Sequence, residues 1–305
     1  MNDIEARAID VAESVLGPLA RRDVPLGART TYRVGGAAAL FVEIVDEADL
    51  PTLVDALAAS GADVLVVGKG SNLLVADRGF PGVAVCLGEH FSSVVVTDGE
   101  VEAGGATPLP VLARRSASAG AVGLEWAVGI PGSVGGAVVM NAGGHGAETI
   151  DRLIDARVLR LGDAREETLD AAALGLRYRH SDLGPSDLVL SANFAVDAGD
   201  RVEADAEISR IVAWRRANQP GGRNGGSVFT NPAGDSAGRL IEAAGLKGLR
   251  IGSATVSEKH ANFIQVDEAG SADDVARLIE EVRAKVADRI GVTLNTELRL
   301  IGFSS

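Results

Sequence analysis

The stretch Asp63-Val64-Leu65-Val66-Val67-Gly68-Lys69-Gly70-Ser71-Asn72 decides the fold, because an apolar run of strand length leads directly into a glycine loop. Ahead of it, residues 39–45 have the pattern of a strand. A helix with apolar residues from Leu50 to Leu57 follows, with a possible cap at Asp46 and an end at Gly61. Strand, helix, strand and glycine loop, in this order, predict an α/β unit.

The loop that ends this unit is a candidate phosphate site. Consecutive backbone N–H groups in a glycine loop can form an anion-binding nest. It is not a Walker A motif, because Lys69 is followed by Gly70 rather than by Ser or Thr. A plain glycine turn remains the alternative interpretation.

A second glycine segment, Gly129-Ile130-Pro131-Gly132-Ser133-Val134-Gly135-Gly136, leaves little side chain between the backbone and a neighbouring group. The stretch Asn141-Ala142-Gly143-Gly144 continues the pattern. Two such loops in one α/β region favour a pyrophosphate that carries a large flat group. A tight structural crossover is the alternative.

The remaining sequence predicts an α+β protein of two lobes. Short strands are expected between about 80 and 105 and over 151–196, with helices at 109–120 and 203–218. A Gly- and Asn-rich stretch follows, then helices at 236–244 and from Ser271 onward, with strands at 261–266 and 293–301. We place a boundary near residue 200 and expect the first lobe to be divisible.

Composition excludes several classes of protein. The net charge of −13 argues against nucleic acid and anionic membranes as broad partners. The single cysteine, Cys86, cannot form an internal disulfide, and the acidic start of the chain lacks the apolar segment of a secretory signal. The apolar stretch 121–140 contains Glu125, Pro131 and several glycines, so we do not expect a membrane span. We therefore expect a cytoplasmic protein.

Three polar positions stand out as candidate catalytic groups. Ser227 follows two glycines and precedes an Asn-Pro turn, so we expect it at the edge of a site, with no histidine base beside it. Arg179 follows a predicted turn, although a surface salt bridge is the alternative. Glu297 and Arg299 alternate along a predicted strand and should share one face, which could also be merely solvated. The four histidines are scattered, so no metal site is predicted.

Together these segments resemble the UDP-N-acetylenolpyruvoylglucosamine reductase family, from about Leu26 to Ile301. Each segment is modestly specific, and their order and spacing are strongly specific. The segments that carry the resemblance are Gly68-Lys69-Gly70-Ser71-Asn72-Leu73, Gly129 to Gly136, Tyr178-Arg179-His180-Ser181, Gly226-Ser227-Val228-Phe229 and Val256-Ser257-Glu258-Lys259-His260-Ala261-Asn262-Phe263.

The resemblance implies an α+β fold with a two-subdomain, vanillyl-alcohol-oxidase-like FAD-binding lobe and a C-terminal α+β substrate lobe. The implied domains are 1–85 and 86–200 for the FAD-binding subdomains and 201–305 for the substrate domain, whose last strand returns Glu297 to the active site. It also implies the subgroup that lacks a tyrosine-bearing insertion, because 200–235 has no room for one.

The resemblance also assigns residues to roles. The implied catalytic residues are Arg179, Ser227 and Glu297. The implied cofactor-binding residues are Tyr32, Gly68, Lys69, Gly70, Ser71, Asn72, Leu73, Gly129, Ile130, Pro131, Gly132, Ser133, Gly135, Gly136, Asn141 and Arg299. The implied substrate-binding residues are Asn231, Lys247 and His260. Departures from the family pattern are His145 for a tyrosine, Thr230 for a lysine and Asn295 for an acidic residue.

The implied activity is reduction of an enolpyruvyl UDP-sugar to UDP-N-acetylmuramate for peptidoglycan, with non-covalent FAD as cofactor and NADPH as hydride donor. The partners are therefore these small molecules, without nucleic acid or membrane insertion. Two alternatives remain open. One is another flavin oxidoreductase of the same fold, such as a sugar or hydroxy-acid oxidase. The other is a protein that binds flavin or nucleotide sugar without turnover.

Overall fold

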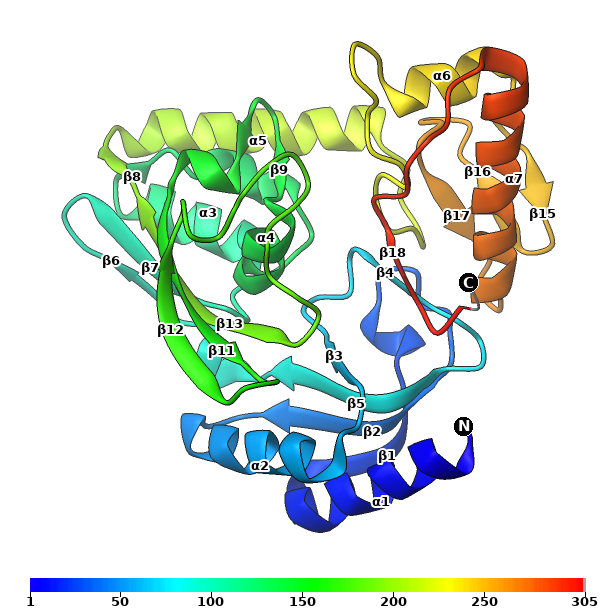
Figure 1. Ribbon diagram of the computed structural model, residues 1–305. Helices are drawn as coiled ribbons and strands as arrows, with labels where there is room; N and C mark the ends of the chain where they lie inside the picture. Colours follow the sequence, from blue (N-terminus) through cyan, green and yellow to red (C-terminus); the bar gives the residue numbers. More distant parts are fainter. Residues whose placement is uncertain (304–305) are drawn as a thin grey trace. The chain divides into compact units, whose positions relative to one another are not determined.

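The computed structural model describes residues 1–303, which form two compact units (Figure 1). Unit 1 consists of Met1–Arg22, Ala39–Lys69 and Pro81–Arg215. Unit 2 consists of Asp23–Ala38, Gly70–Phe80 and the described residues from Arg216 onward. The chain therefore passes from one unit to the other inside the first glycine loop, after Lys69. The three-domain division at 85/86 and 200/201 stays a prediction.

The first sheet, mostly in unit 1, has the strand order β1 (Ala20–Pro25), β2 (Ala37–Ile44), β5 (Phe80–Leu87), β3 (Val64–Val66). Helices α1 (Asp3–Leu16) and α2 (Leu50–Ser60) lie along one side of it (Figure 1). Asn2 caps α1 in a reciprocal capping box with Glu5, and Gly61 ends α2 with φ of 61°. Both helices bury their apolar faces in one core with β2 and β5.

The second sheet of unit 1 is antiparallel and has the order β12-β11-β13-β7-β6. Its strands are β6 (Val94–Val96), β7 (Glu100–Gly104), β11 (Leu153–Arg160), β12 (Arg165–Asp170) and β13 (Asp187–Ala195). Helices α3 (Leu109–Ser118), α4 (Val134–Met140) and α5 (Arg201–Asn218) pack against the core that this sheet builds. Two small pairs, β8 (Ala121–Val122) with β14 (Asp197–Ala198) and β9 (Gly143–Gly144) with β10 (Ala147–Glu148), complete the unit.

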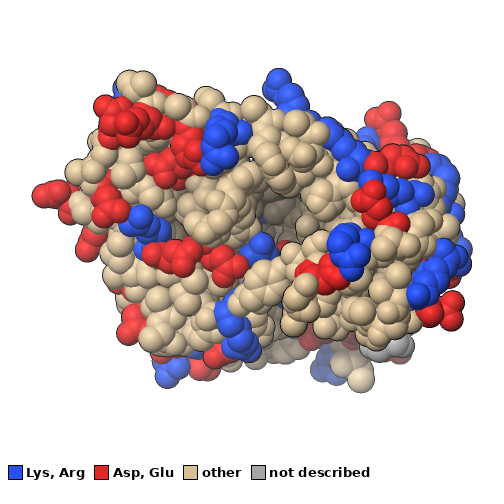
Figure 2. Space-filling view, turned by 90° about the horizontal axis from the view of Figure 1, so that it is seen from above, with Lys and Arg blue, Asp and Glu red and all other residues tan. Residues whose placement is uncertain are grey.

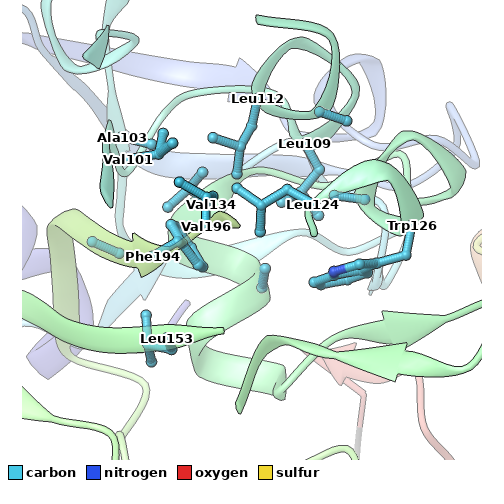
Figure 3. Packing of buried hydrophobic residues seen from close by; sticks show 14 of the residues in the cluster. Val101, Ala103, Leu109, Leu112, Leu124, Trp126, Val134, Leu153, Phe194 and Val196 are labelled. Atoms are coloured by element: carbon cyan, nitrogen blue, oxygen red, sulfur yellow. The ribbon is translucent and has the colours of Figure 1, made fainter. Parts of the chain in front are cut away.

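The core of this second sheet anchors the second glycine segment. Val134, the first residue of α4, is fully buried beside Leu109 and Leu124 (Figure 3). Trp126 lies at one side of the same cluster. The glycine segment is thus anchored in one apolar core by Trp126 just before it and by Val134 within it.

Unit 2 contains the antiparallel sheet β15 (Arg250–Ile251), β16 (Ala254–Val256), β17 (Ile264–Val266) and the helices α6 (Ala237–Ala243) and α7 (Ala272–Ile290). Six residues of α7 are buried at helical spacing against this sheet. A separate parallel pair joins β4 (Leu73–Val75) to β18 (Arg299–Ile301), with Arg299 opposite Leu73. The first glycine loop therefore leads straight into a strand that pairs near the end of the described chain.

Three sequence expectations need correction. The strand predicted over 293–301 is present only as Arg299–Ile301, and the one over 261–266 only as Ile264–Val266. Glu297 therefore precedes the strand, and the prediction that Glu297 and Arg299 share one strand face was wrong. In addition, α4 lies within a glycine segment that gave no helical prediction.

Within residues 1–303, no helix combines the length and apolar character needed to cross a bilayer. Over the same range, no group of three or more His, Cys, Asp or Glu side chains has an arrangement suited to a metal ion. On the face seen in Figure 2, Lys and Arg side chains lie among Asp and Glu side chains. That face therefore carries no broad area of one charge sign.

Candidate active site

The first glycine loop presents unused backbone donors. In the part of the chain that the structure describes, the N–H groups from Gly68 to Asn72 donate no hydrogen bond to other protein groups. Gly70 has φ of 61°, and a Cβ there would lie 2.2 Å from the Arg29 carbonyl oxygen, so only glycine fits. A loop of this kind suits an anionic group such as a phosphate.

Arg299 adds a positive charge beside this loop. The backbone N–H of Arg299 donates to the Asn72 carbonyl (3.1 Å), and the Asn72 side chain donates to the Glu297 carbonyl (3.2 Å). Burial lowers the pKa of Arg299. Among residues 1–303, no acidic side chain pairs with its guanidinium. A half-buried cation without a carboxylate partner is the expected complement of an anionic ligand.

The second glycine segment meets the first. A Cβ on Gly68 would lie 2.6 Å from the Ser133 hydroxyl oxygen, so the two loops are in direct contact. Ser133 caps α4 by accepting from the Gly136 N–H (3.3 Å). The N–H groups of Val134 and Gly135 donate to the carbonyls of residues 107 and 105, which fixes the segment against the second sheet.

Tyr32 and its neighbour Thr31 carry buried hydroxyls without a hydrogen-bond partner among the described residues. Burial raises the pKa of Tyr32, and the Gly225 backbone near its hydroxyl does not reach hydrogen-bond geometry. Thr31 also donates its N–H to the Gly70 carbonyl (3.1 Å). Unsatisfied buried hydroxyls next to the first loop fit a bound polar ligand, because orphaned groups of this kind are rare in native proteins.

Ser227 lies outside any helix or strand, half-buried, as expected for a residue at the edge of a site. Gly226 ahead of it has φ of 76°, and Val228 and Phe229 behind it are buried. The Val228 carbonyl accepts from the N–H of Glu297 (2.8 Å). Ser227 and Glu297 are therefore carried by adjacent backbone segments of unit 2, although 70 residues separate them in the sequence.

Asn262 holds the Ser227 segment from the other side. Its side-chain oxygen accepts from the Phe229 N–H (3.0 Å), and its side-chain nitrogen donates to the Phe229 carbonyl (2.8 Å). Its own carbonyl accepts from the Val228 N–H (2.9 Å). This buried asparagine therefore acts as a strand partner for Val228 and Phe229, and it fixes the backbone that carries the serine.

Arg179 belongs to unit 1 and has a left-handed backbone, with φ of 54°. Its Nη1 donates to Glu148 Oε1 (3.2 Å) and its Nη2 to the Gly143 carbonyl (2.8 Å). Asn141 is fully buried, and its side-chain nitrogen donates to Glu148 Oε2 (2.9 Å) and to the Arg177 carbonyl (3.2 Å). The Asn141 side chain is thus engaged within the protein, and its role as a cofactor contact stays a prediction.

The three predicted substrate residues gather around α6 in unit 2. Asn231 accepts from the Ala237 N–H at the start of α6 (3.0 Å), and Lys247 donates to Glu242 (2.8 Å). His260 packs next to Gly238 of the same helix, since a Cβ there would lie 3.3 Å from the imidazole. Burial lowers the pKa of His260. One lysine, one imidazole and one amide around a single short helix could hold a diphosphate.

Sequence profiles and relatives cover the whole of this arrangement. A profile described as "UDP-N-acetylenolpyruvoylglucosamine reductase, C-terminal domain" matches residues 218–301, and one described as "FAD binding domain" matches residues 38–169. The UDP-N-acetylenolpyruvoylglucosamine reductase of Synechococcus sp. (strain WH7803) is 44% identical over 291 residues, covering 93% of this chain and 94% of that protein. The chain belongs to the UDP-N-acetylenolpyruvoylglucosamine reductase family.

Further comparisons agree with the family. The reductase of Methylorubrum populi is 44% identical over 309 residues, covering 100% of this chain and 97% of that protein. A crystal structure of UDP-N-acetylenolpyruvylglucosamine reductase from Thermus caldophilus matches with a TM-score of 0.80 and 34% identity, covering 92% of this chain and 99% of that one. Phl p 4.0202, a glucose dehydrogenase, shares the fold at a TM-score of 0.50 and 12% identity, over 69% of this chain and 50% of that one. The predicted fold class is confirmed, and the alternative functions gain no support.

Thr230 and Asn295, two of the three positions expected to depart from the family pattern, contact each other directly. Thr230 donates its N–H to the Asn295 carbonyl (2.9 Å), and its hydroxyl reaches the same oxygen (3.3 Å). The third, His145, lies in the β9–β10 turn with φ of 57° and meets Trp214 edge-on at 5.1 Å between ring centres. Burial lowers the pKa of His145, which favours a neutral imidazole.

Sequence reasoning placed Ser227 and Glu297 at one site, and the structure of unit 2 brings their segments together. It missed Glu148 and Asn262, the side chains that hold Arg179 and the serine segment. Asn262 had a signal, because it is a lone amide within the apolar run from Ala261 to Ile264. Glu148 had none, because its contact with Arg179 spans 31 residues. Arg179 and the other two catalytic candidates lie in different units, so their meeting at one substrate stays a prediction.

Proposed function

We propose that this protein reduces UDP-N-acetyl-3-O-(1-carboxyvinyl)glucosamine to UDP-N-acetylmuramate with NADPH, as a step in peptidoglycan precursor synthesis in the cytoplasm. The observation that carries the proposal is the match to reductases of this name along more than nine-tenths of the chain. Non-covalent FAD is the cofactor, in line with the FAD-binding domain over residues 38–169.

The residues present fit FAD. The donors of Gly68 to Asn72 suit the negatively charged parts of a dinucleotide, as does the guanidinium of Arg299, which has no acidic partner among residues 1–303. The absence of a side chain at Gly68 lets the Ser133 side chain lie against the first loop, so both glycine segments can contribute to one cofactor site. Bound FAD would supply the hydride-transfer chemistry, and the protein supplies binding, orientation and electrostatics.

Substrate recognition is assigned to unit 2. We propose that Lys247, His260 and Asn231, which lie around α6, hold the uridine diphosphate part of the substrate. The lysine contributes charge, while the imidazole, kept neutral by burial, contributes a directional hydrogen bond.

The catalytic residues act on charge and protons. When the terminal carbon of the enolpyruvyl C=C bond gains hydride, negative charge develops on the other alkene carbon and its carboxylate. Arg179 is proposed to hold this carboxylate, because a guanidinium cannot lose its proton and stabilises the charge electrostatically. Ser227 then donates its proton to the carbanionic carbon. Glu297, on the neighbouring segment, is proposed to share a proton with the developing enol.

The test is a pair of half-reactions in stopped-flow absorbance on FAD-loaded protein. Without oxygen, wild type must first consume more than one equivalent of NADPH per FAD only when the enolpyruvyl UDP-sugar is present. Ser227→Ala should keep flavin reduction by NADPH and slow flavin reoxidation by the sugar nucleotide by about 10²- to 10³-fold. Equal slowing of both half-reactions would contradict the role of Ser227. Reduced flavin that the sugar nucleotide does not reoxidise in wild type would contradict the function.

A further inference from the structure

Arg179 has an unusual backbone conformation, and a separate hairpin contacts its side chain. A left-handed φ of 54° is uncommon for a residue with a long side chain, and it persists only where the surroundings impose it. Arg177 and His180, on either side, exchange backbone hydrogen bonds of 3.0 and 2.9 Å across the turn. The turn fixes the backbone of Arg179, but it does not fix where the guanidinium goes.

The β9–β10 hairpin fixes the guanidinium. Gly143 and Glu148 are directly paired across this hairpin. The glycine carbonyl receives Nη2 of Arg179 and the glutamate carboxylate receives Nη1, so one cross-strand pair engages both terminal nitrogens. Gly143 cannot carry a side chain, because a Cβ would lie 2.6 Å from Glu148 Cγ. The glycine therefore keeps open the space that the glutamate occupies.

Glu148 is itself fixed by Asn141. One carboxylate oxygen binds Arg179 and the other accepts from Asn141, which is fully buried. Asn141 also contacts the Arg177 carbonyl and accepts from the Ile150 N–H (2.9 Å). The buried amide thus ties the hairpin to the turn that carries Arg179, and Glu148 lies between them.

We propose that Glu148 is a positioning residue for the reduction: it orients the Arg179 guanidinium toward the substrate carboxylate, and Asn141 holds Glu148 in place. The inference rests on the proposed function. Glu148 also offsets part of the charge of Arg179. Its removal should therefore misalign the guanidinium in the transition state while leaving the protein at least as attractive to the carboxylate in the ground state.

This balance gives a signature that a merely structural role would not produce. In FAD-loaded full-length protein, Glu148→Ala should slow flavin reoxidation by the enolpyruvyl UDP-sugar by about 10- to 100-fold, since small misplacements of catalytic groups cost this much. Flavin reduction by NADPH should change by less than about threefold. The dissociation constant of the product, UDP-N-acetylmuramate, measured by calorimetry, should not rise by more than about threefold.

A double-mutant cycle isolates the path through Arg179. Glu148→Ala should have less than about a twofold effect on reoxidation when Arg179 is already alanine, because coupled residues are not additive. Glu102→Ala removes an exposed glutamate of β7 outside this network and should behave as wild type. If Glu148→Ala does not fold, Glu148→Gln keeps the shape, removes the charge and should show the same split between rate and affinity.

Three results would overturn the proposal. One is reoxidation at the wild-type rate in Glu148→Ala. Another is loss of product affinity in parallel with the rate. The last is a double variant in which the rate losses of Glu148→Ala and Arg179→Ala multiply, as they do for independent residues. If the sugar nucleotide does not reoxidise the reduced flavin of the wild-type protein, the proposed function itself is wrong. The two failures are therefore distinguishable.

Discussion

Asn262→Asp is a minimal change to the side chain that holds the backbone segment carrying Ser227. An ionised aspartate keeps an acceptor for the Phe229 N–H but has no donor for the Phe229 carbonyl. It also places a carboxylate oxygen against that carbonyl oxygen. Asn262 is only 4% exposed, so water cannot replace the lost donor. A buried carbonyl without a donor costs about 1–3 kcal/mol, and with the repulsive contact we expect about 2–4 kcal/mol of lost stability.

The measurement is thermal unfolding of FAD-loaded protein. At this size of unit, 2–4 kcal/mol corresponds to a fall of roughly 5–15 °C in the unfolding midpoint. Because the altered bond lies two residues from Ser227, reoxidation by the sugar nucleotide should slow about 10- to 100-fold while flavin reduction is kept. Asn2→Asp is the matched control, because either residue caps a helix equally well and α1 should be unaffected.

An unchanged midpoint in Asn262→Asp would refute the idea that the asparagine holds this segment. A lower midpoint with normal reoxidation would show that Asn262 stabilises unit 2 without controlling where Ser227 lies. Either outcome can be read without a structure of the variant.

Two further predictions concern charge. Arg299→Leu should weaken FAD binding at least about tenfold, yet raise or preserve the thermal midpoint of the cofactor-free protein, because it removes a half-buried charge that lacks a carboxylate partner among residues 1–303. Unchanged FAD retention would contradict this prediction. Arg7→Leu, on the exposed side of α1, is the control. Burial lowers the pKa of His260, so the stability that the neutral imidazole confers is complete above its unfolded pKa near 6.5 and is lost as the pH falls through the lower folded value. The thermal midpoint should therefore fall less below about pH 6.5 in His260→Gln than in wild type, and parallel curves would refute the assignment.

Local chemistry allowed several elements to be predicted. The helix that Gly61 ends, the helix that begins after Ser271 and the strand before Gly68 each had an apolar period with a cap or glycine at the right place. These signals lie within a few residues of the element that they specify. The predicted elements therefore form in the structure, with small shifts at their ends.

Other elements depend on contacts that the local sequence does not contain. Residues 293–298 alternate like a strand, yet the segment lies beside Val228 through single backbone bonds and becomes a strand only at Arg299, where β4 is available. Helix α4 forms in a glycine-rich segment because Val134 and Val138 enter a core built by distant strands. In both cases tertiary packing overrides local propensity.

The same limit applies to the site. The position of Ser227 in a half-buried loop was predictable because glycines and a turn surround it in the sequence, while its catalytic role stays a prediction. The supports for Arg179 and for the serine segment were not, because hydrogen bonds across 31 and 33 residues leave no local pattern. Arg299 was assigned by resemblance, and only the structure shows that its guanidinium lacks an acidic partner among residues 1–303.

The pairing of β4 with β18 has a consequence for biosynthesis. Asn72 and Glu297, which join the two segments, are 225 residues apart. At about 5–20 residues per second, a ribosome needs roughly 10–45 s to make the intervening chain. Throughout that interval Leu73, Leu74 and Val75 lack the neighbour that later covers their backbone. The nascent polypeptide should then be a client for chaperones that shield apolar strands, and flavin capture should come after translation rather than during it.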